Sequence, residues 1–153
     1  MVLRVPYFRQ HTDYTCGPAC VRMVLALHGK RVKERTLARS LKTNARCGTY
    51  NSAITALGRR IGFRFQTSSR AKWRNVLTQI RHSQPVLVNF VEPTSEEGHY
   101  ALVTGYQREK VLLHDPWNGK YFRIPLKDFK RRWLGYGTRS EKWGWMAVCE
   151  KKE

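Results

Sequence analysis

The sequence predicts an α+β fold in a single domain, and three observations lead to this prediction. The chain has 153 residues, a length that suits one domain. Signals for helices fill its first half, whereas short runs rich in β-branched and aromatic residues, bounded by turn residues, fill its second half. Helices followed by strands are typical of α+β domains, so we expect the N-terminal helices to pack on an antiparallel sheet. No Gly/Ser linker divides the chain, and residues 1–153 are treated as one domain.

The first helix has a clear start and a clear stop. Gly17-Pro18 precede the apolar run from Ala19 to His28, and Gly29 follows it. Proline in the first turn and glycine just past the end are typical helix boundaries. Apolar residues occupy nearly every face of this segment, so we expect a buried central helix that begins at Cys16.

Further helices are expected around Glu34 to Leu41, around Ser52 to Arg60 and near Ala71 to Arg81. The last of these carries apolar residues at three- and four-residue spacing, which predicts one buried face. Those residues are Trp73, Val76, Leu77 and Ile80.

The second half contains short strand-like runs separated by glycine, proline or charged turns. The predicted strands are Val86 to Val91, Tyr100 to Tyr106, Lys110 to Leu113, Tyr121 to Ile124 and Trp145 to Cys149. A short helix is expected near Leu126 to Trp133, between the last two strands.

Composition excludes several classes of protein. At 41% hydrophobic and 12% aromatic residues the chain has enough apolar material for a core, which argues against intrinsic disorder. No apolar run reaches the length of a membrane span, and the N-terminus has no apolar stretch typical of a secretory signal. We therefore expect a cytoplasmic protein without a membrane span.

The four cysteines stand at positions 16, 20, 47 and 149 and include no CxxC pair. Four are too few for a disulfide scaffold, and the spacing argues against a structural zinc site. We expect free thiols, no metal and no other cofactor.

The chain is strongly basic, with 29 Lys and Arg against 11 Asp and Glu and a formal net charge of +18. The segment from Arg22 to His82 holds fifteen Lys or Arg and one acid, Glu34. Such a surplus favours weak, non-specific contact with nucleic acid or another acidic surface. A solvated surface that keeps the protein soluble is the simpler interpretation of the same charge.

The segment from Gln10 to Cys20 is the most informative stretch. It places Cys16 at the start of the buried helix, where free backbone N–H groups and the helix dipole stabilise a thiolate. Gly17 adds no side-chain bulk beside the sulfur. Taken alone, Cys16 is better explained as a small buried apolar residue, as free cysteines usually are.

A histidine and an aspartate occur where strands begin and end. His99 opens one predicted strand, and Asp115 closes the next one just before Pro116. If these strands pair as a hairpin around Gln107 to Glu109, both side chains lie at the same end of the sheet, within reach of each other. A nucleophile, a base and an orienting acid would then follow in the order Cys16, His99, Asp115.

Gln10 lies six residues before Cys16, on a loop that could turn its side-chain amide toward the sulfur. An amide donor there could bind the oxyanion of a tetrahedral intermediate. Each of these residues also has a simple structural explanation, such as a turn-forming aspartate before proline. The argument depends on all four occurring in the right order.

These residues resemble those of the bacteriocin-processing peptidases, papain-like cysteine peptidases that cut leader peptides after a double glycine. The similarity rests on Gln10, the Cys16-Gly17-Pro18-Ala19 box, Gly98-His99-Tyr100 and Asp115-Pro116. It continues through Trp117-Asn118-Gly119 to Phe129 and Trp133-Leu134-Gly135, and so extends over residues 5–149.

The resemblance implies a papain-like fold and the cleavage of a peptide or leader-peptide bond. It implies that Cys16 is the nucleophile, His99 the general base and acid, Asp115 the residue that orients His99, and Gln10 the oxyanion donor. Many members are the N-terminal domain of an ABC exporter. This sequence shows neither a membrane region nor an ATPase, so we expect a stand-alone peptidase domain that acts on a peptide or protein substrate.

Two other functions stay open. The first is a nucleic-acid-binding module on an inactive papain-like fold, contacting phosphates through Arg59-Arg60, Lys72 to Arg74 or Lys130-Arg131-Arg132. No signature of a known nucleic-acid-binding motif supports it. The second is a peptide-binding pseudoenzyme, against which the complete set of Cys, His, Asp and Gln argues.

Overall fold

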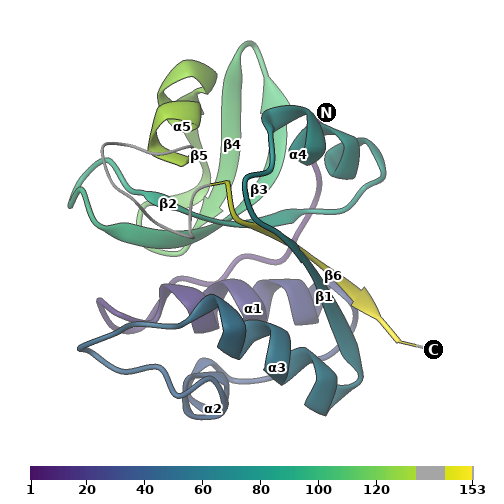
Figure 1. The fold of residues 1–153 in the computed structure, drawn as a ribbon, viewed down its shortest axis with the longest axis vertical. Coiled ribbons are helices and arrows are strands. Elements are labelled where there is room, and N and C mark those ends of the chain that lie inside the picture. Colours follow the sequence, from purple (N-terminus) through teal and green to yellow (C-terminus); the bar gives the residue numbers. More distant parts are fainter. Residues whose placement is uncertain (134–143, 153) are drawn as a thin grey trace.

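The computed structural model describes residues 1–133 and 144–152, which form helices and strands in the arrangement of Figure 1. The helices of this part are α1 (Cys16–Leu27), α2 (Glu34–Ser40), α3 (Asn51–Ile61), α4 (Trp73–Arg81) and α5 (Leu126–Trp133). Its strands are β1 (Phe63–Ser68), β2 (Val86–Val91), β3 (Gly98–Gln107), β4 (Lys110–Asp115), β5 (Gly119–Pro125) and β6 (Met146–Lys151). None of these helices has the length and apolar character needed to cross a bilayer.

The strands form one antiparallel sheet in the order β1-β6-β2-β3-β4-β5. Strands β2 to β5 follow one another as a meander, whereas β6 inserts between β1 and β2. Figure 1 shows α1, α2 and α3 on one side of this sheet and α4 and α5 on the other. The α+β prediction, with N-terminal helices packed on an antiparallel sheet, is therefore confirmed.

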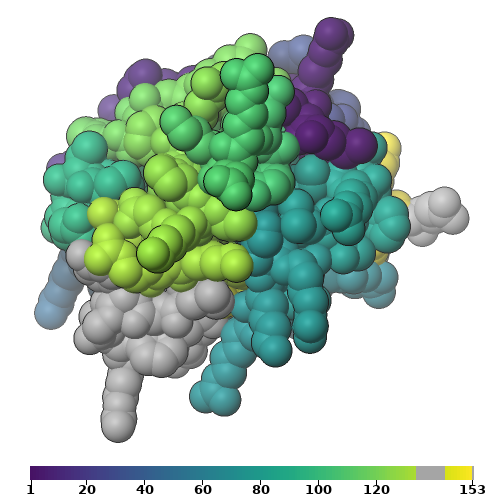
Figure 2. Space-filling model, turned by 90° about the horizontal axis from the view of Figure 1, so that it is seen from above, coloured from purple at the N-terminus to yellow at the C-terminus, as the bar shows by residue number. Residues whose placement is uncertain are grey.

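Each face of the sheet has its own apolar core. On the first face, buried residues of α1 such as Val21 pack with Phe63 of β1 and Leu102 of β3. On the second face, Trp73 of α4 and Phe129 of α5 have ring centroids 5.8 Å apart. Figure 2 shows these two helices side by side on the outer surface. Alternate residues of the central strands supply the two cores, as the period of a strand requires.

Helix α1 is buried along most of its length, as its sequence predicts. Pro18 lies in the first turn, where its missing N–H costs no helical hydrogen bond. A Cβ atom on Gly17 would lie 2.6 Å from Oγ1 of Thr49. Glycine is therefore required for the start of α1 to approach the loop before α3, and this close approach fixes where Cys16 lies.

Strand β1 was not among the predicted strands, and its omission is the main error in the predicted elements. Phe63 and Phe65 point into the core while Arg64 and Gln66 point outward, so an alternating signal was present over four residues. Charged and polar residues outnumber apolar ones in this strand because its outer face is exposed.

Of the motif Trp133-Leu134-Gly135, the last two residues lie outside the described residues.

Strands β3 and β4 form the predicted hairpin. Gln107 pairs with Lys110, so Arg108 and Glu109 form a two-residue turn. Both turn residues have positive φ, 52° and 60°, as in the tight turns that suit the twist of a hairpin. This register places the start of β3 and the end of β4 at the same end of the sheet, side by side.

Candidate active site

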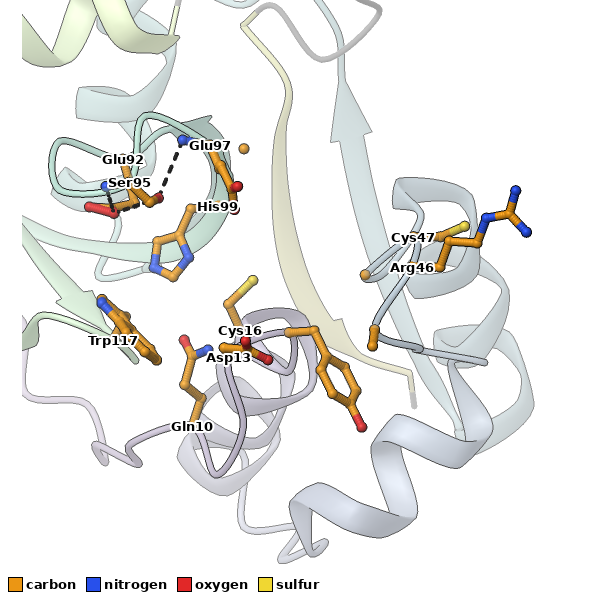
Figure 3. A pocket seen from close by; sticks show the side chains of 14 residues that line it. Gln10, Asp13, Cys16, Arg46, Cys47, Glu92, Ser95, Glu97, His99 and Trp117 are labelled. Carbon is orange, nitrogen blue, oxygen red and sulfur yellow. Dashed lines mark hydrogen bonds between the residues drawn. The ribbon is translucent and has the colours of Figure 1, made fainter.

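The four residues expected at the site come from separate segments that meet at one cavity. Cys16 begins α1, His99 lies at the start of β3, and Gln10 precedes α1. These three line a cavity of about 610 Å³, which Figure 3 shows from close by. Asp115 ends β4, is fully buried and lies behind His99.

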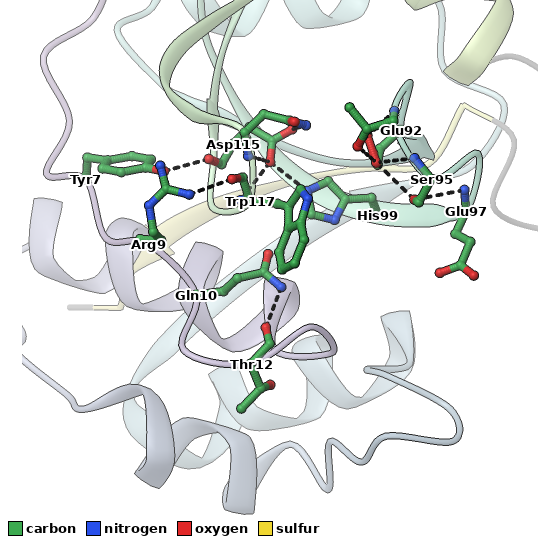
Figure 4. A network of polar contacts seen from close by, with 12 residues as sticks. Tyr7, Arg9, Gln10, Thr12, Glu92, Ser95, Glu97, His99, Asp115 and Trp117 are labelled. Atoms are coloured by element: carbon green, nitrogen blue, oxygen red, sulfur yellow. Dashed lines mark hydrogen bonds and ion pairs between the residues drawn. The ribbon is translucent and has the colours of Figure 1, made fainter.

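His99 and Asp115 form a buried pair. Nε2 of His99 lies 2.7 Å from Oδ1 of Asp115. Figure 4 shows the contact between the two side chains. The same oxygen accepts hydrogen bonds from the backbone N–H groups of Trp117 (2.9 Å) and Asn118 (3.0 Å), and Oδ2 accepts one from Nδ2 of Asn118 (3.0 Å). Asp115 therefore both shapes the turn after β4 and holds the imidazole, so its two interpretations do not compete.

The electrostatics of this pair favour a protonated ring. Burial alone would lower the pKa of His99, but the hydrogen bond with Asp115 and the nearby Cys16 thiol outweigh it and raise the pKa to about 10. Burial would raise the pKa of Asp115, whereas the hydrogen bonds from His99 and Asn118 lower it. Since Asp115 occupies Nε2 of His99, Nδ1 is the ring nitrogen left for Cys16.

The thiols differ in whether their surroundings allow them to act as nucleophiles. Cys16 is half-buried at the N-terminus of α1, where unpaired N–H groups and the helix dipole stabilise negative charge. Burial raises the pKa of Cys20 well above its ordinary value, and burial raises that of Cys149 to about 12. Cys47 is exposed and lines the same cavity as Cys16, on the loop before α3.

Gln10 has an unusual environment for a side-chain amide. It is 7% exposed, and its Nε2 donates to the carbonyl of Thr12 at 2.7 Å. Its Oε1 is buried and has no hydrogen-bond partner in the described residues. Nε2 carries a second hydrogen, so one donor of this amide stays available to a ligand in the cavity.

The segment before α1 is tied to the turn that follows Asp115. The hydroxyl of Tyr7 donates to the carbonyl of Asp115 (2.7 Å), and the Arg9 guanidinium donates to that of Trp117 (2.6 Å). The backbone N–H of Gln10 donates to Pro116 (3.0 Å). Figure 4 shows the contacts of Tyr7 and Arg9. Together the three hydrogen bonds fix Gln10 relative to His99.

Glu34 supports the loop before Cys16 and could not be identified from the sequence. It is buried at the start of α2, and its carboxylate oxygens accept hydrogen bonds from the backbone N–H of His11 at 3.1 and 3.2 Å. Nδ1 of His11 lies 3.4 Å from one of them. The only available signal was that Glu34 is the single acid in a long basic segment.

The basic cluster 130–132 is not a free cationic surface. Arg132 is buried and contacts Asp128 at 3.0 Å and Glu96 at 3.2 Å. Arg131 contacts the other oxygen of Asp128 at 2.8 Å. Two of its three cations are thus bound to carboxylates within the protein.

Within residues 1–133 and 144–152, no three His, Cys, Asp or Glu side chains come together as the ligands of a metal would. The chemistry available at the cavity is that of a thiol beside an imidazole–carboxylate pair.

Three solved structures share this fold. The peptidase domain of Streptococcus ComA, a bi-functional ABC transporter involved in quorum sensing, is 20% identical with a TM-score of 0.76, over 95% of this chain and 97% of that one. A double glycine motif protease from an AMS/PCAT transporter, solved with a leader peptide, is 18% identical with a TM-score of 0.75, over 99% and 94%. A Bacillus anthracis protein described as a C39-like peptidase is 15% identical with a TM-score of 0.77, over 99% and 98%.

A search of curated proteins finds no match to the chain. The sequence model of one family, described as Peptidase_C39 like family, matches residues 2–141. That match takes in the cavity, the hairpin and the segment before α1. Because it extends over nearly the whole sequence, the chain belongs to the Peptidase_C39 like family.

Proposed function

We propose that this protein is a cysteine peptidase in which Cys16, His99 and Asp115 act as nucleophile, general acid–base and orienting carboxylate. The observation that carries the proposal is the 2.7 Å contact between His99 and Asp115 beside the cavity that Cys16 lines. Membership of the family and the shared fold support the same activity.

The reaction follows from the charges at the site. The Cys16 sulfur attacks the carbonyl carbon of the substrate, and the carbonyl electron pair moves onto oxygen. When the tetrahedral intermediate collapses, the imidazolium of His99 gives its proton to the leaving amine, which leaves an acyl group on the sulfur. Water then loses a proton to His99, attacks the acyl carbon and releases the acid and the thiolate.

We assign the oxyanion donor to Gln10. Its Nε2 donates to Thr12 and its backbone N–H donates to Pro116, so the side chain is already fixed before the substrate binds. The second Nε2 hydrogen can therefore bind the oxyanion without a further entropic cost. Removing one such donor lowers turnover by about 10²–10³ in well-studied hydrolases.

The finer substrate assignment is cleavage of a leader peptide after a double glycine. It rests on the relative solved with a leader peptide and named for the double glycine motif. Within this proposal, two glycines before the scissile bond present no side chain where the peptide passes between Cys16 and His99.

The test is to identify new N-termini in a peptide library and in proteins incubated with the purified chain. Cleavage should be lost in Cys16→Ala and should fall by about 10²–10³ in Gln10→Ala. Cys47→Ala is the matched control, since it removes the other thiol of the cavity, and it should retain activity. A Gln10→Ala protein with an unchanged rate would remove the oxyanion role, and an active Cys16→Ala protein would overturn the proposal.

A nucleic-acid-binding module on an inactive fold was the alternative function. The solved structures reported above are described as peptidases or proteases, and the cluster 130–132 is largely engaged in internal ion pairs. No feature of the described residues favours it over the peptidase.

A further inference from the structure

The cavity beside Cys16 is acidic, although the protein as a whole is strongly basic. Its described lining includes the acids Asp13, Glu92 and Glu97 and, apart from the His99 imidazolium that pairs with Asp115, one cation, Arg46. The whole chain has 29 Lys and Arg against 11 Asp and Glu. Figure 3 shows the guanidinium of Arg46 directed away from Cys16, so it does not neutralise the centre of the cavity.

The three acids are not equivalent. Glu92 is buried, and its carboxylate is occupied by hydrogen bonds from Thr94 and Ser95, so it organises the loop before His99. Asp13 and Glu97 are exposed, and their carboxylates take part in no ion pair or hydrogen bond within residues 1–133 and 144–152. In a protein with so many cations, two unpaired carboxylates remain beside the candidate nucleophile.

Two further groups in the lining suit a cationic ligand. Oε1 of Gln10 is buried, without a partner in the described chain, and accepts hydrogen bonds only. Trp117 is 46% exposed although it is a large apolar residue, and it forms another wall of the cavity. Carboxylates, a carbonyl oxygen and an indole face are the groups that bind ammonium and guanidinium groups.

We infer that this cavity selects peptides that carry a lysine or an arginine close to the scissile bond, and that Asp13 and Glu97 determine this specificity. The inference rests on the proposed peptidase function. Asp13 lies three residues before Cys16 and Glu97 two residues before His99, and both line the same cavity as the reacting groups. The net charge of the protein does not prevent this, because charges further than about 8 Å away are screened at physiological salt.

The test uses fluorogenic peptides that differ at one position. Lysine, norleucine or glutamate is placed in turn at the third position before the cleaved bond and at the first and second positions after it, and glycine is kept at the two positions directly before the bond. At one or more positions we expect lysine to exceed norleucine by about tenfold in kcat/KM, the combined effect of two exposed charge pairs. Asp13→Asn and Glu97→Gln should each reduce this ratio about threefold, and the double variant should abolish it.

The control is Glu109→Gln, which removes an exposed carboxylate from the turn between β3 and β4, away from the cavity. It should leave the lysine-to-norleucine ratio unchanged. The ratio is measured within each variant, so differences in folding or active fraction cancel. Equal or better cleavage of norleucine or glutamate peptides at every position would overturn the inference, as would a preference that persists in the double variant.

Binding to Cys16→Ala separates this inference from the proposed function. Fluorescence anisotropy should show tighter binding of the lysine peptide than of the norleucine peptide, and Asp13→Asn with Glu97→Gln should abolish the difference. If no peptide is cleaved but this difference is found, the peptidase proposal fails and the cationic specificity stands. If peptides are cleaved without any such difference, the specificity fails and the peptidase stands.

Discussion

The buried pair of His99 and Asp115 allows a prediction that needs no substrate. Asp115→Asn keeps an oxygen that can accept from His99, Trp117 and Asn118, but it removes the negative charge behind the imidazole. In the unaltered protein Nδ2 of Asn118 donates to Oδ2 of Asp115. In the variant this oxygen is replaced by an NH₂ group, so two donors face each other and this hydrogen bond is lost. The main expected effect is therefore a loss of the attraction that keeps His99 protonated.

The size of the effect follows from the pKa of His99. A pKa of about 10, against an ordinary value of 6.5, corresponds to about 5 kcal/mol in favour of the protonated ring. Burial opposes this, and Cys16 shares the favourable part with Asp115. If Asp115 supplies about half, its replacement by asparagine should lower the pKa of His99 to about 8, at a cost of about 2–3 kcal/mol.

The assay is a titration of the ¹⁵N-labelled imidazoles by NMR between about pH 5 and pH 10.5, the range that spans the ordinary and the raised pKa. A His99→Gln protein identifies the His99 signals. His114 is the internal control, because burial lowers its pKa and it contacts Val5 rather than Asp115. A His99 pKa near 6.5 in the unaltered protein, or one unmoved by Asp115→Asn, would refute the argument from the charged pair.

Two further predictions concern the thiols and the pH dependence of stability. Limited iodoacetamide at about pH 6 should label Cys16 before the exposed Cys47, because only Cys16 lies at a helix N-terminus beside an imidazolium; peptide mapping that finds Cys47 first would contradict this. Burial would raise the pKa of Glu92, but hydrogen bonds from Thr94 and Ser95 lower it from 4.5 to about 2. The ionised carboxylate therefore stabilises the folded protein above pH 4.5, and this contribution is lost as the pH falls toward 2. Calorimetry should find that Glu92→Gln has a lower Tm at neutral pH and that the difference shrinks as the solution is acidified; a constant difference would exclude this role.

Most of the fold could be predicted because its signals are local. The limits of α5 were predicted as observed, and the other helices to within about two residues, since proline, glycine and apolar spacing mark them directly. Strand β1 was missed because only Phe63 and Phe65 are apolar within it. The position of β6 between β1 and β2 depends on pairings between residues 58 to 88 positions apart in the sequence, such as Phe65 with Cys149, and no local pattern encodes them.

The candidate site divides in the same way. The proximity of His99 and Asp115 could be predicted from the sequence because a two-residue turn fixes the register of their strands. The contribution of Glu34 could not be found, since it depends on how α2 packs against the loop before Cys16. The acidic lining of the cavity was also hidden, because Asp13 and Glu97 are distant in sequence and meet only in the folded chain.

The place of β6 in the sheet has a consequence for synthesis on the ribosome. Residues 146–151 pair with β1 on one side and with β2 on the other, so the sheet stays split until they have left the exit tunnel. Cys16 is made early, but its partners His99 and Asp115 and the strand that completes the sheet come much later. Folds that depend on such distant contacts form slowly and as a unit. A nascent chain of this protein therefore carries the Cys16 thiol without an assembled site until His99 and Asp115 have been made.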